Sequence, residues 1–167
     1  MLKKVAILVN GGDAPGLNPV IRAITKTAEN KKQKGKNMET NLLTAEEKRD
    51  RNISLMEDLV EYLCRNGIFY DVNIYVNGRV FSSNPCKGSA ARSVNGYICY
   101  DCGECNVAEH VEYSNPETVT MTFEGPLYHA YNGYDPYTHA EKDIWEIAEK
   151  YGLYPEQGYA WSLAFYE

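Results

Sequence analysis

Residues 69–82, FYDVNIYVNGRVFS, decide the fold class of this chain. Apolar side chains alternate along the first part, at Val72, Ile74 and Val76, as expected for a strand that buries one face. Asn77-Gly78 is a strong signal for a type I′ turn, so residues 79–82 are predicted to return as the antiparallel partner strand. This hairpin indicates an antiparallel sheet.

Further strands are predicted after this hairpin along the remaining chain. Residues 96–100 and 106–113 are expected to form a strand pair, and the polar residues 83–93 a loop. Residues 118–123, TVTMTF, follow Asn115-Pro116 and alternate clearly. At the end of the chain, residues 159–165 alternate as in a half-buried strand, whereas residues 127–137 show no clear period.

Two helices are predicted from capping boxes, in which a hydroxyl side chain and a glutamate three residues later satisfy the first N–H groups. One covers residues 45–65 after Thr44 and ends at Asn66-Gly67. The other opens at residues 138–141, Thr-His-Ala-Glu, and ends at Tyr151-Gly152. The predicted fold class is α+β, an antiparallel sheet with two packed helices, preceded by a short βα unit.

That βα unit is predicted from residues 5–24, VAILVNGGDAPGLNPVIRAI. Apolar residues run into Gly11-Gly12, and an amphipathic run begins near Leu17, which is the pattern of a buried strand, a glycine turn and a helix start. Glycine lets the backbone approach a ligand closely, and the N-terminus of a helix favours an anion such as phosphate. A glycine turn that serves packing alone fits the same residues.

Residues 3–23, KKVAILVNGGDAPGLNPVIRA, resemble the N-terminal strand, loop and helix of the phosphofructokinase family, both ATP- and pyrophosphate-dependent. The resemblance covers residues 3–28. It implies that Gly11 and Gly12 contact a donor phosphate of ATP or pyrophosphate, with Asp13 and Gly16 in the same loop. The family's Gly-Asp-Gly-Ser and Thr-Ile-Asp-Asn-Asp segments are missing from this chain, so no catalytic residue is assigned.

Charge divides the chain into two parts. Residues 1–37 hold 8 Lys and Arg against 2 Asp and Glu, whereas residues 38–167 hold 9 against 21. The change falls at residues 31–37, KKQKGKN, which is typical of a solvated linker. We therefore predict a phosphofructokinase-like fragment at residues 1–30, a basic linker at 31–37 and an acidic α+β domain at 38–167.

The five cysteines suggest a metal site. Cys99, Cys102 and Cys105 follow a C-x2-C-x2-C spacing that partly resembles a zinc knuckle, and Cys86 or His110 could supply the fourth ligand. An iron–sulfur cluster accepts the same spacing. A hairpin with free thiols is the simpler alternative, so zinc is a possible rather than a required cofactor.

Acidic and aromatic residues gather in the last part of the chain. Residues 93–167 contain 13 Asp and Glu against 2 Lys and Arg, 11 of the 14 tyrosines and both tryptophans. Tyrosine and tryptophan are favoured at protein interfaces, and carboxylates steer basic partners. An ordinary acidic surface over an aromatic core has the same composition. Partner-binding residues are predicted in a short segment and the helix start after it: Tyr128, Tyr131, Tyr134, Asp135, Tyr137 and Glu141.

Two functions are compatible with these patterns. The first is a non-catalytic domain that binds a basic protein, similar in size and charge to anti-CRISPR and antirestriction inhibitors of nucleic-acid-binding proteins. The second is a degenerate phosphofructokinase-like protein that binds ATP, pyrophosphate or a sugar phosphate. The acidic balance argues against direct contact with nucleic acid. No apolar run approaches the roughly 20 residues of a membrane span, so a cytoplasmic protein is expected.

Overall fold

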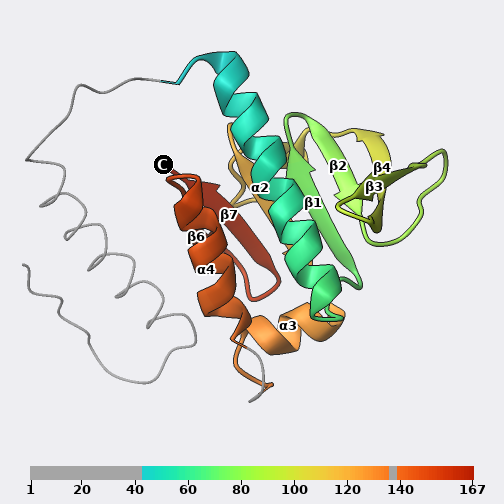
Figure 1. Cartoon of the computed structure of the whole chain (residues 1–167), viewed down its shortest axis with the longest axis vertical. Helices are drawn as coiled ribbons and strands as arrows, with labels where there is room; N and C mark the ends of the chain where they lie inside the picture. Colours follow the sequence, from blue (N-terminus) through green and yellow to red (C-terminus); the bar gives the residue numbers. More distant parts are fainter. Residues whose placement is uncertain (1–42, 136–138) are drawn as a thin grey trace, which may run out of the picture. The chain divides into compact units, whose positions relative to one another are not determined.

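The computed structural model describes residues 43–135 and 139–167, which belong to one compact unit that begins at Leu43 (Figure 1). The predicted fragment at residues 1–30 and the linker at 31–37 lie outside the described residues. The helices and strands, in chain order, are α2 (Ala45–Arg65), β1 (Val72–Val76), β2 (Arg79–Ser82), β3 (Ala90–Val94), β4 (Tyr97–Glu104), the 3-10 helix η1 (Val107–Glu109), β5 (Val119–Phe123), α3 (Gly125–Tyr131), α4 (Ala140–Lys150), β6 (Tyr154–Gln157) and β7 (Ser162–Tyr166).

The strands form a seven-stranded sheet in the order β3-β4-β2-β1-β5-β7-β6, with every neighbouring pair antiparallel. The predicted hairpin is confirmed, because β1 and β2 pair across Asn77 and Gly78, whose φ angles of 49° and 75° are both positive. Positive φ at both central residues is the requirement of a type I′ turn. The expected α+β fold class is thus confirmed for the described residues.

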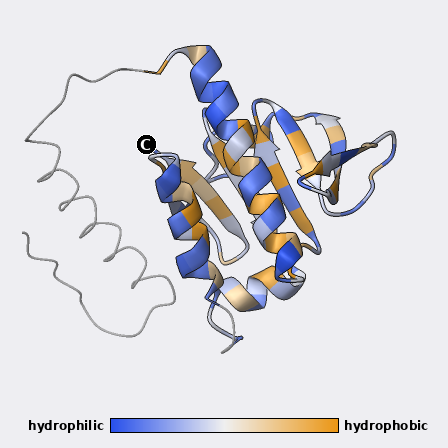
Figure 2. Ribbon diagram, viewed as in Figure 1, coloured by the Kyte–Doolittle hydropathy of each residue, from blue (hydrophilic) through white to orange (hydrophobic). Residues whose placement is uncertain are grey.

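Helices α2 and α4 lie across the same face of the sheet (Figure 1). The strands supply Ile74, Met121 and Leu163, which are paired neighbours on β1, β5 and β7 and are fully buried. Helix α2 places Leu55, Leu59 and Leu63 in the same core, four residues apart and therefore on one side of the helix. Hydrophilic colours along both helices in Figure 2 mark their solvent-facing sides.

Helix α2 begins at the predicted capping box. The Glu47 N–H donates to the Thr44 hydroxyl at 3.2 Å, and the Thr44 N–H donates to the Glu47 carboxylate at 2.7 Å. The last residue of the domain is held at the same end, because the Glu167 carboxylate is 3.0 Å from both the Lys48 ammonium and the Arg51 guanidinium. The beginning and the end of the domain therefore lie close together.

The connection between β4 and β5 covers part of the opposite face of the sheet. Thr120 and Ser162 alternate with core residues and so point to that face, yet both are buried. The Asn115 N–H donates to the Thr120 hydroxyl at 2.9 Å, and the Asn115 amide donates to the Phe165 carbonyl at 2.7 Å. The Thr118 hydroxyl donates to the same carbonyl. Polar side chains thus replace a second helical layer here.

The structure corrects the predicted strands between residues 83 and 113. Strand β3 begins inside the predicted loop, because Asn95-Gly96 forms a second turn with positive φ angles of 49° and 88° and pairs β3 with β4. This is the same signal as Asn77-Gly78, and it places the hairpin earlier than expected. The strand predicted at residues 106–113 is wrong, since this segment holds η1 and turns.

Two elements in the last third of the chain also differ from expectation. Helix α3 occupies part of the segment without a clear period, and it begins with Gly125 and Pro126. Strand β6 precedes the final strand, which starts at Ser162, so Tyr159 and Trp161 lie in the turn before it. Helix α4 was predicted to begin with a capping box, but its N-cap is His139, with no side-chain hydrogen bond. Thr138 lies outside the described residues.

Candidate functional site

Three aromatic side chains form an exposed row at the turn between β6 and β7. Tyr159 and Trp161 are stacked, with ring centroids 5.1 Å apart and planes 12° apart. Tyr113, from the connection between β4 and β5, lies 5.1 Å from Tyr159 at 59°. The exposed fractions of Tyr113, Tyr159 and Trp161 are 50%, 36% and 39%. Large aromatic side chains grouped on a surface are typical of a binding site.

Backbone contacts fix the turn that carries this row. The Tyr159 N–H donates to the Ser162 hydroxyl at 2.9 Å, and the Phe123 N–H donates to the Trp161 carbonyl at 2.9 Å. Gly158 lets the two segments meet, because a Cβ at this position would lie 2.6 Å from the Tyr113 Cβ. The sequence therefore holds the aromatic row in place through one glycine and one serine.

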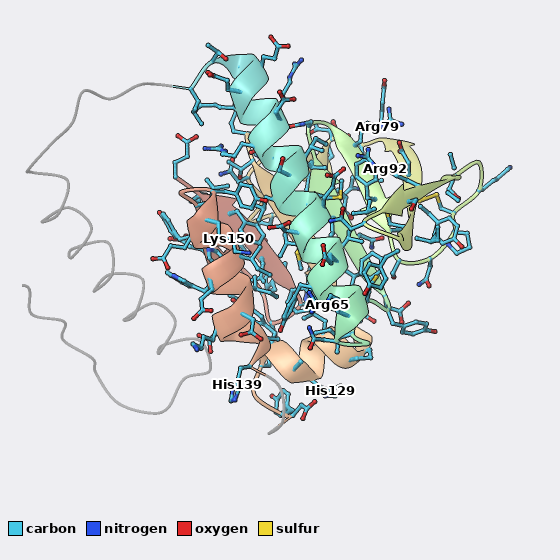
Figure 3. All side chains as sticks on the ribbon, in the orientation of Figure 1. Arg65, Arg79, Arg92, His129, His139 and Lys150 are labelled. Carbon is cyan, nitrogen blue, oxygen red and sulfur yellow. A yellow bond between two sulfur atoms is a disulfide. The ribbon has the colours of Figure 1, made fainter. Side chains whose placement is uncertain are left out.

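Asn132, at the C-terminal end of α3, joins this row to a second aromatic pair. Its amide donates to the Ala160 carbonyl at 2.8 Å, and its oxygen accepts from the Gln157 amide at 3.0 Å. Tyr128 and Tyr134 flank Asn132 in the chain and are stacked at 6.1 Å and 14°, and Tyr134 is 68% exposed. His129, labelled in Figure 3, packs edge-on against both rings.

Carboxylates accompany these aromatic side chains, whereas lysine and arginine do not. The Tyr159 hydroxyl donates to Glu112, and this bond raises the pKa of Tyr159. Glu124 follows Phe123 directly, and Asp135 follows Tyr134. The sequence has no lysine or arginine between Arg92 and Lys142, or after Lys150. We define the acidic aromatic end as these eight residues: Glu112, Tyr113, Glu124, Tyr128, Tyr134, Asp135, Tyr159 and Trp161.

The arginine and lysine side chains labelled in Figure 3 belong to other elements of the fold. Arg79 and Arg92 lie on β2 and β3. Arg65, in the last turn of α2, pairs with Glu61 at 3.4 Å, and Lys150, at the end of α4, pairs with Asp58 at 3.7 Å. The positive charge of the domain is therefore largely paired with carboxylates of the same domain.

The residues predicted to bind a partner are separated by the structure. Tyr128, Tyr134 and Asp135 lie together in the acidic aromatic end. Tyr131 is 9% exposed and packs on Phe123 at 5.7 Å, and its burial raises its pKa. Glu141 lies in the first turn of α4, and Tyr137 lies outside the described residues. A binding role for any of them stays a prediction.

Sequence reasoning did not assign Tyr113, Tyr159 and Trp161 to a site. Tyr113 was placed in a strand that does not form, and Tyr159 and Trp161 in one that begins later. Gly158, directly before Tyr159, is the one local signal that could have indicated a turn at this position.

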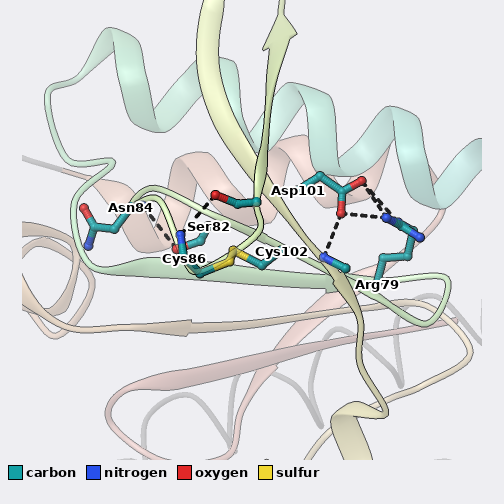
Figure 4. The surroundings of a disulfide bond; sticks show 8 residues. Arg79, Ser82, Asn84, Cys86, Asp101 and Cys102 are labelled. Atoms are coloured by element: carbon teal, nitrogen blue, oxygen red, sulfur yellow. Dashed lines mark hydrogen bonds and ion pairs between the residues drawn. A yellow bond between two sulfur atoms is a disulfide. The ribbon is translucent and has the colours of Figure 1, made fainter.

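The structure does not bring the four predicted zinc ligands together. Cys86 and Cys102 form a disulfide between the loop after β2 and strand β4 (Figure 4), whereas Cys99 is buried in the core. Cys105 is half-buried just after β4, and its N–H donates to the Gly78 carbonyl. In residues 43–135 and 139–167, no three His, Cys, Asp or Glu side chains are grouped to hold a metal.

The geometry of strand β4 explains why the predicted zinc ligands are separated. Side chains three residues apart on a strand point to opposite faces, and Cys99 and Cys102 both belong to β4. A zinc knuckle would need a tight turn at these residues to aim both thiolates at one ion. Burial raises the pKa of Cys99 and Cys64, which is unfavourable for the thiolate that a metal requires.

A cavity of about 560 Å³ lies on another part of the surface, beside the turn between β1 and β2. Asn77 and Asn115 line it, but their amides already donate to the Arg49 and Phe165 carbonyls. Cys105 also lines it, and desolvation raises the pKa of this thiol. The two asparagine amides are therefore already used by the fold.

Comparison with known proteins finds relatives for one short segment at the N-terminus. It is 70% identical over 27 residues to ATP-dependent 6-phosphofructokinase 2 of Clostridium perfringens, which covers 16% of this chain and 7% of that enzyme. It is 68% identical over 28 residues to the ATP-dependent 6-phosphofructokinase of Mycoplasmopsis pulmonis, which covers 17% and 9%. The enzyme of Lactobacillus helveticus is 63% identical over 27 residues, covering 16% and 8%.

These matches confirm the expected resemblance to phosphofructokinases for the N-terminal segment alone. This chain spans less than a tenth of the relatives' length. Neither a protein-family model nor a solved structure matches the chain. Gly11, Gly12, Asp13 and Gly16 lie outside the described residues, so their contact with a phosphate stays a prediction.

Proposed function

We propose that residues 43–167 form a non-catalytic domain that binds a basic protein through its acidic aromatic end. One observation supports this proposal: tyrosine and tryptophan side chains are stacked at the surface, in segments that contain carboxylates and lack lysine and arginine. Aromatic residues provide rigid contact area, and complementary charge speeds and orients association. Both properties suit recognition of a positively charged surface.

The partner we propose is a basic protein that binds nucleic acid, and the proposed effect is inhibition. A protein surface that binds the phosphates of nucleic acid displays lysine and arginine side chains. A row of carboxylates can bind these same side chains in place of the phosphates. The domain supports this with 20 Asp and Glu against 9 Lys and Arg in residues 43–167. Inhibition would then follow from occupying the nucleic-acid surface.

Two variants of equal charge test the proposal. The first, Glu112→Gln with Glu124→Gln and Asp135→Asn, neutralises the acidic aromatic end. The matched control, Glu46→Gln with Asp50→Asn and Glu149→Gln, removes three exposed carboxylates from α2 and α4. Proteins captured from host extract by each variant are quantified at about 0.05 M and about 0.5 M salt, where surface charges are screened to different degrees.

We expect the wild type and the control to retain the same basic protein, and the first variant and high salt to release it. Adding the purified domain should then lower the captured protein's affinity for its nucleic acid. Equal capture by both triple variants would contradict the proposed surface. An unchanged affinity for nucleic acid would contradict inhibition.

A second candidate function is favoured by the match to phosphofructokinases. We propose that the loop containing Gly11, Gly12, Asp13 and Gly16 binds ATP, pyrophosphate or a sugar phosphate, as the glycine turn before a helix would allow. Gly11→Val should abolish binding of ATP or pyrophosphate measured by calorimetry, whereas Gly35→Val in the linker should not. Absence of binding by the wild-type chain would contradict this function.

The cytoplasmic location expected from the sequence also stays a proposal. Within residues 43–135 and 139–167, none of the helices has both the length and the apolar character needed to cross a membrane. The disulfide between Cys86 and Cys102 is of a kind that persists in oxidising compartments. Thiol labelling of protein taken directly from cells would decide between the two environments.

A further inference from the structure

Building on the proposed function, we propose that the acidic aromatic end recognises an arginine-rich segment of its partner and prefers arginine to lysine. The partner class is a protein segment with several guanidinium groups. Three features support this choice: flat aromatic stacks, carboxylates next to them in the chain, and two stacks joined through one residue.

The stacks provide flat faces of the kind that a guanidinium group prefers. Tyr159 and Trp161 lie within 12° of parallel, and Tyr128 and Tyr134 within 14°. A guanidinium is planar and weakly hydrated, so it stacks on an aromatic face, and tryptophan is the strongest such partner. The ammonium of lysine is compact and strongly hydrated, so it gains less from the same surface.

The domain contains an example of this contact. The Arg92 guanidinium lies 5.4 Å from the centroid of the Phe81 ring while it also bonds the Glu57 carboxylate at 2.6 Å. One arginine thus uses an aromatic face and a carboxylate together. The acidic aromatic end contains the same two kinds of group, aromatic rings and carboxylates.

Carboxylates lie in the same segments as the two stacks. The Glu112 carboxylate accepts from the Tyr159 hydroxyl of the first stack, and Glu124 follows Phe123, whose N–H donates to the Trp161 carbonyl. Asp135 adjoins Tyr134 of the second stack, and its N–H donates to the His129 carbonyl. Arginine binds a carboxylate through two parallel hydrogen bonds, which lysine cannot reproduce.

The two stacks favour a segment over a single side chain. Asn132 contacts the Ala160 carbonyl next to the first stack and the Tyr128 carbonyl in the second, at 2.8 Å each. Both stacks are therefore held on one rigid unit, and two arginines of one chain can engage them together. Simultaneous contacts of one chain strengthen each other through effective concentration.

Peptides of eight arginines and of eight lysines test this inference, because they carry equal charge. Binding is measured by calorimetry with the full chain, and by fluorescence with Trp145→Phe, which leaves Trp161 as the only tryptophan. The comparison variants are Trp161→Leu and Tyr134→Leu, with Ile98→Ala as a control for an exposed apolar side chain on β4. Circular dichroism establishes that each variant is folded.

We expect the arginine peptide to bind the wild type about 5-fold more tightly than the lysine peptide, as exposed cation–π contacts would give. Trp161→Leu should remove this preference, Tyr134→Leu should reduce it, and Ile98→Ala should leave it unchanged. In Trp145→Phe, the arginine peptide should change the fluorescence of Trp161.

The remaining outcomes separate this inference from the proposed function. Equal affinity for the two peptides overturns the preference for arginine but leaves an acidic surface for a basic protein. A preference that survives both Trp161→Leu and Tyr134→Leu, or an unchanged fluorescence of Trp161, overturns the assigned surface. If neither peptide binds at low salt, both the inference and the proposed function are overturned.

Discussion

Arg79 and Arg92, at the β3–β4 end of the sheet, form ion pairs within the domain, whereas the segments that carry the acidic aromatic end contain no lysine or arginine. Arg79 holds both oxygens of Asp101 at 2.9 Å, and Arg92 holds Glu57 at 2.6 Å. Between Arg92 and Lys142 the sequence offers no such partner. Positive charge at the β3–β4 end forms ion pairs between elements of the fold, and we propose that the acidic aromatic end uses its charge to bind a partner.

Asp101 illustrates the internal use of charge. Desolvation works against its ionisation, but the Gly103 N–H and the Arg79 guanidinium outweigh this and hold the pKa of Asp101 below its ordinary value. Stability from this group is present above its ordinary pKa and is lost as the pH falls through the lowered one. Under the proposed function, recognition and stability depend on different carboxylates of this domain.

The largest expected effect concerns the disulfide at the β3–β4 end. Replacing Cys86 or Cys102 by serine should lower the free energy of unfolding by about 3 kcal/mol, because the bond closes a loop across 16 positions. Urea unfolding of each variant measures this loss of free energy, and the wild-type protein with its disulfide reduced should be as stable as the two serine variants. Cys105→Ser is the control, since this cysteine is free. An unchanged wild type after reduction would show that the bond does not form.

Gly158→Ala should have the next largest effect, and it acts on the acidic aromatic end. The new methyl group would lie 2.6 Å from the Tyr113 Cβ, so the aromatic row must move, at a cost of about 1–3 kcal/mol. Near-ultraviolet circular dichroism should record the displaced rings. Gly88→Ala strains its own turn, where φ is 84°, but its added carbon meets no atom within 4 Å, so the signals of the Tyr113, Tyr159 and Trp161 rings should stay unchanged. Identical spectra for both variants would contradict the contact.

Tyr62→Phe should cost about 1 kcal/mol at neutral pH, because the Tyr62 hydroxyl donates to Asp143 at 2.9 Å and joins α2 to α4. Desolvation and this carboxylate raise the pKa of Tyr62 above its ordinary 10.0, and desolvation raises that of Tyr151 to about 12. The two tyrosines therefore make their full contribution to the free energy of unfolding below pH 10, and this contribution is lost as the pH rises above 10. Urea unfolding between neutral and strongly alkaline pH should show a shallower decline for Tyr62→Phe. A decline as steep as that of the wild type would exclude this tyrosine as its source.

The smallest expected effects on stability compare one charged residue from the β3–β4 end with one from the acidic aromatic end. Arg92→Gln should lower the free energy of unfolding by about 0.5–1 kcal/mol, as expected for a partly exposed ion pair with an aromatic contact. Glu124→Gln should change it by less than about 0.5 kcal/mol, as for a surface residue outside such features. Thermal unfolding measures both. A larger loss for Glu124→Gln would mean that its carboxylate is structural.

Local signals were sufficient where one short segment determines its own geometry. Helix α2 followed from the Thr44 capping box, and the β1–β2 hairpin from Asn77-Gly78. Asn95-Gly96 carried the same signal for β3 and β4, but the polar residues before it favoured a loop. Helix α3 gave little signal, because it has seven residues and begins with glycine and proline.

The candidate surface was predicted only in part, for a reason that lies in the tertiary structure. Composition indicated Tyr128, Tyr134 and Asp135, which are neighbours in sequence. Tyr113 and Tyr159 meet only because the β4–β5 connection crosses the sheet and Gly158 leaves room for it. The cysteine spacing suggested that the thiols bind one ion. Because side chains alternate between the two faces of β4, the structure separates them instead.

The ion pairs of Glu167 with Lys48 and Arg51 have a practical consequence for this domain. They hold its last residue beside the first turns of α2, so chain attached before residue 43 or after residue 167 leaves from neighbouring points. Domains with adjacent ends tolerate insertion into a host loop and circular permutation. Residues 43–167 should therefore fold when they are inserted as one domain into a loop of an unrelated carrier protein.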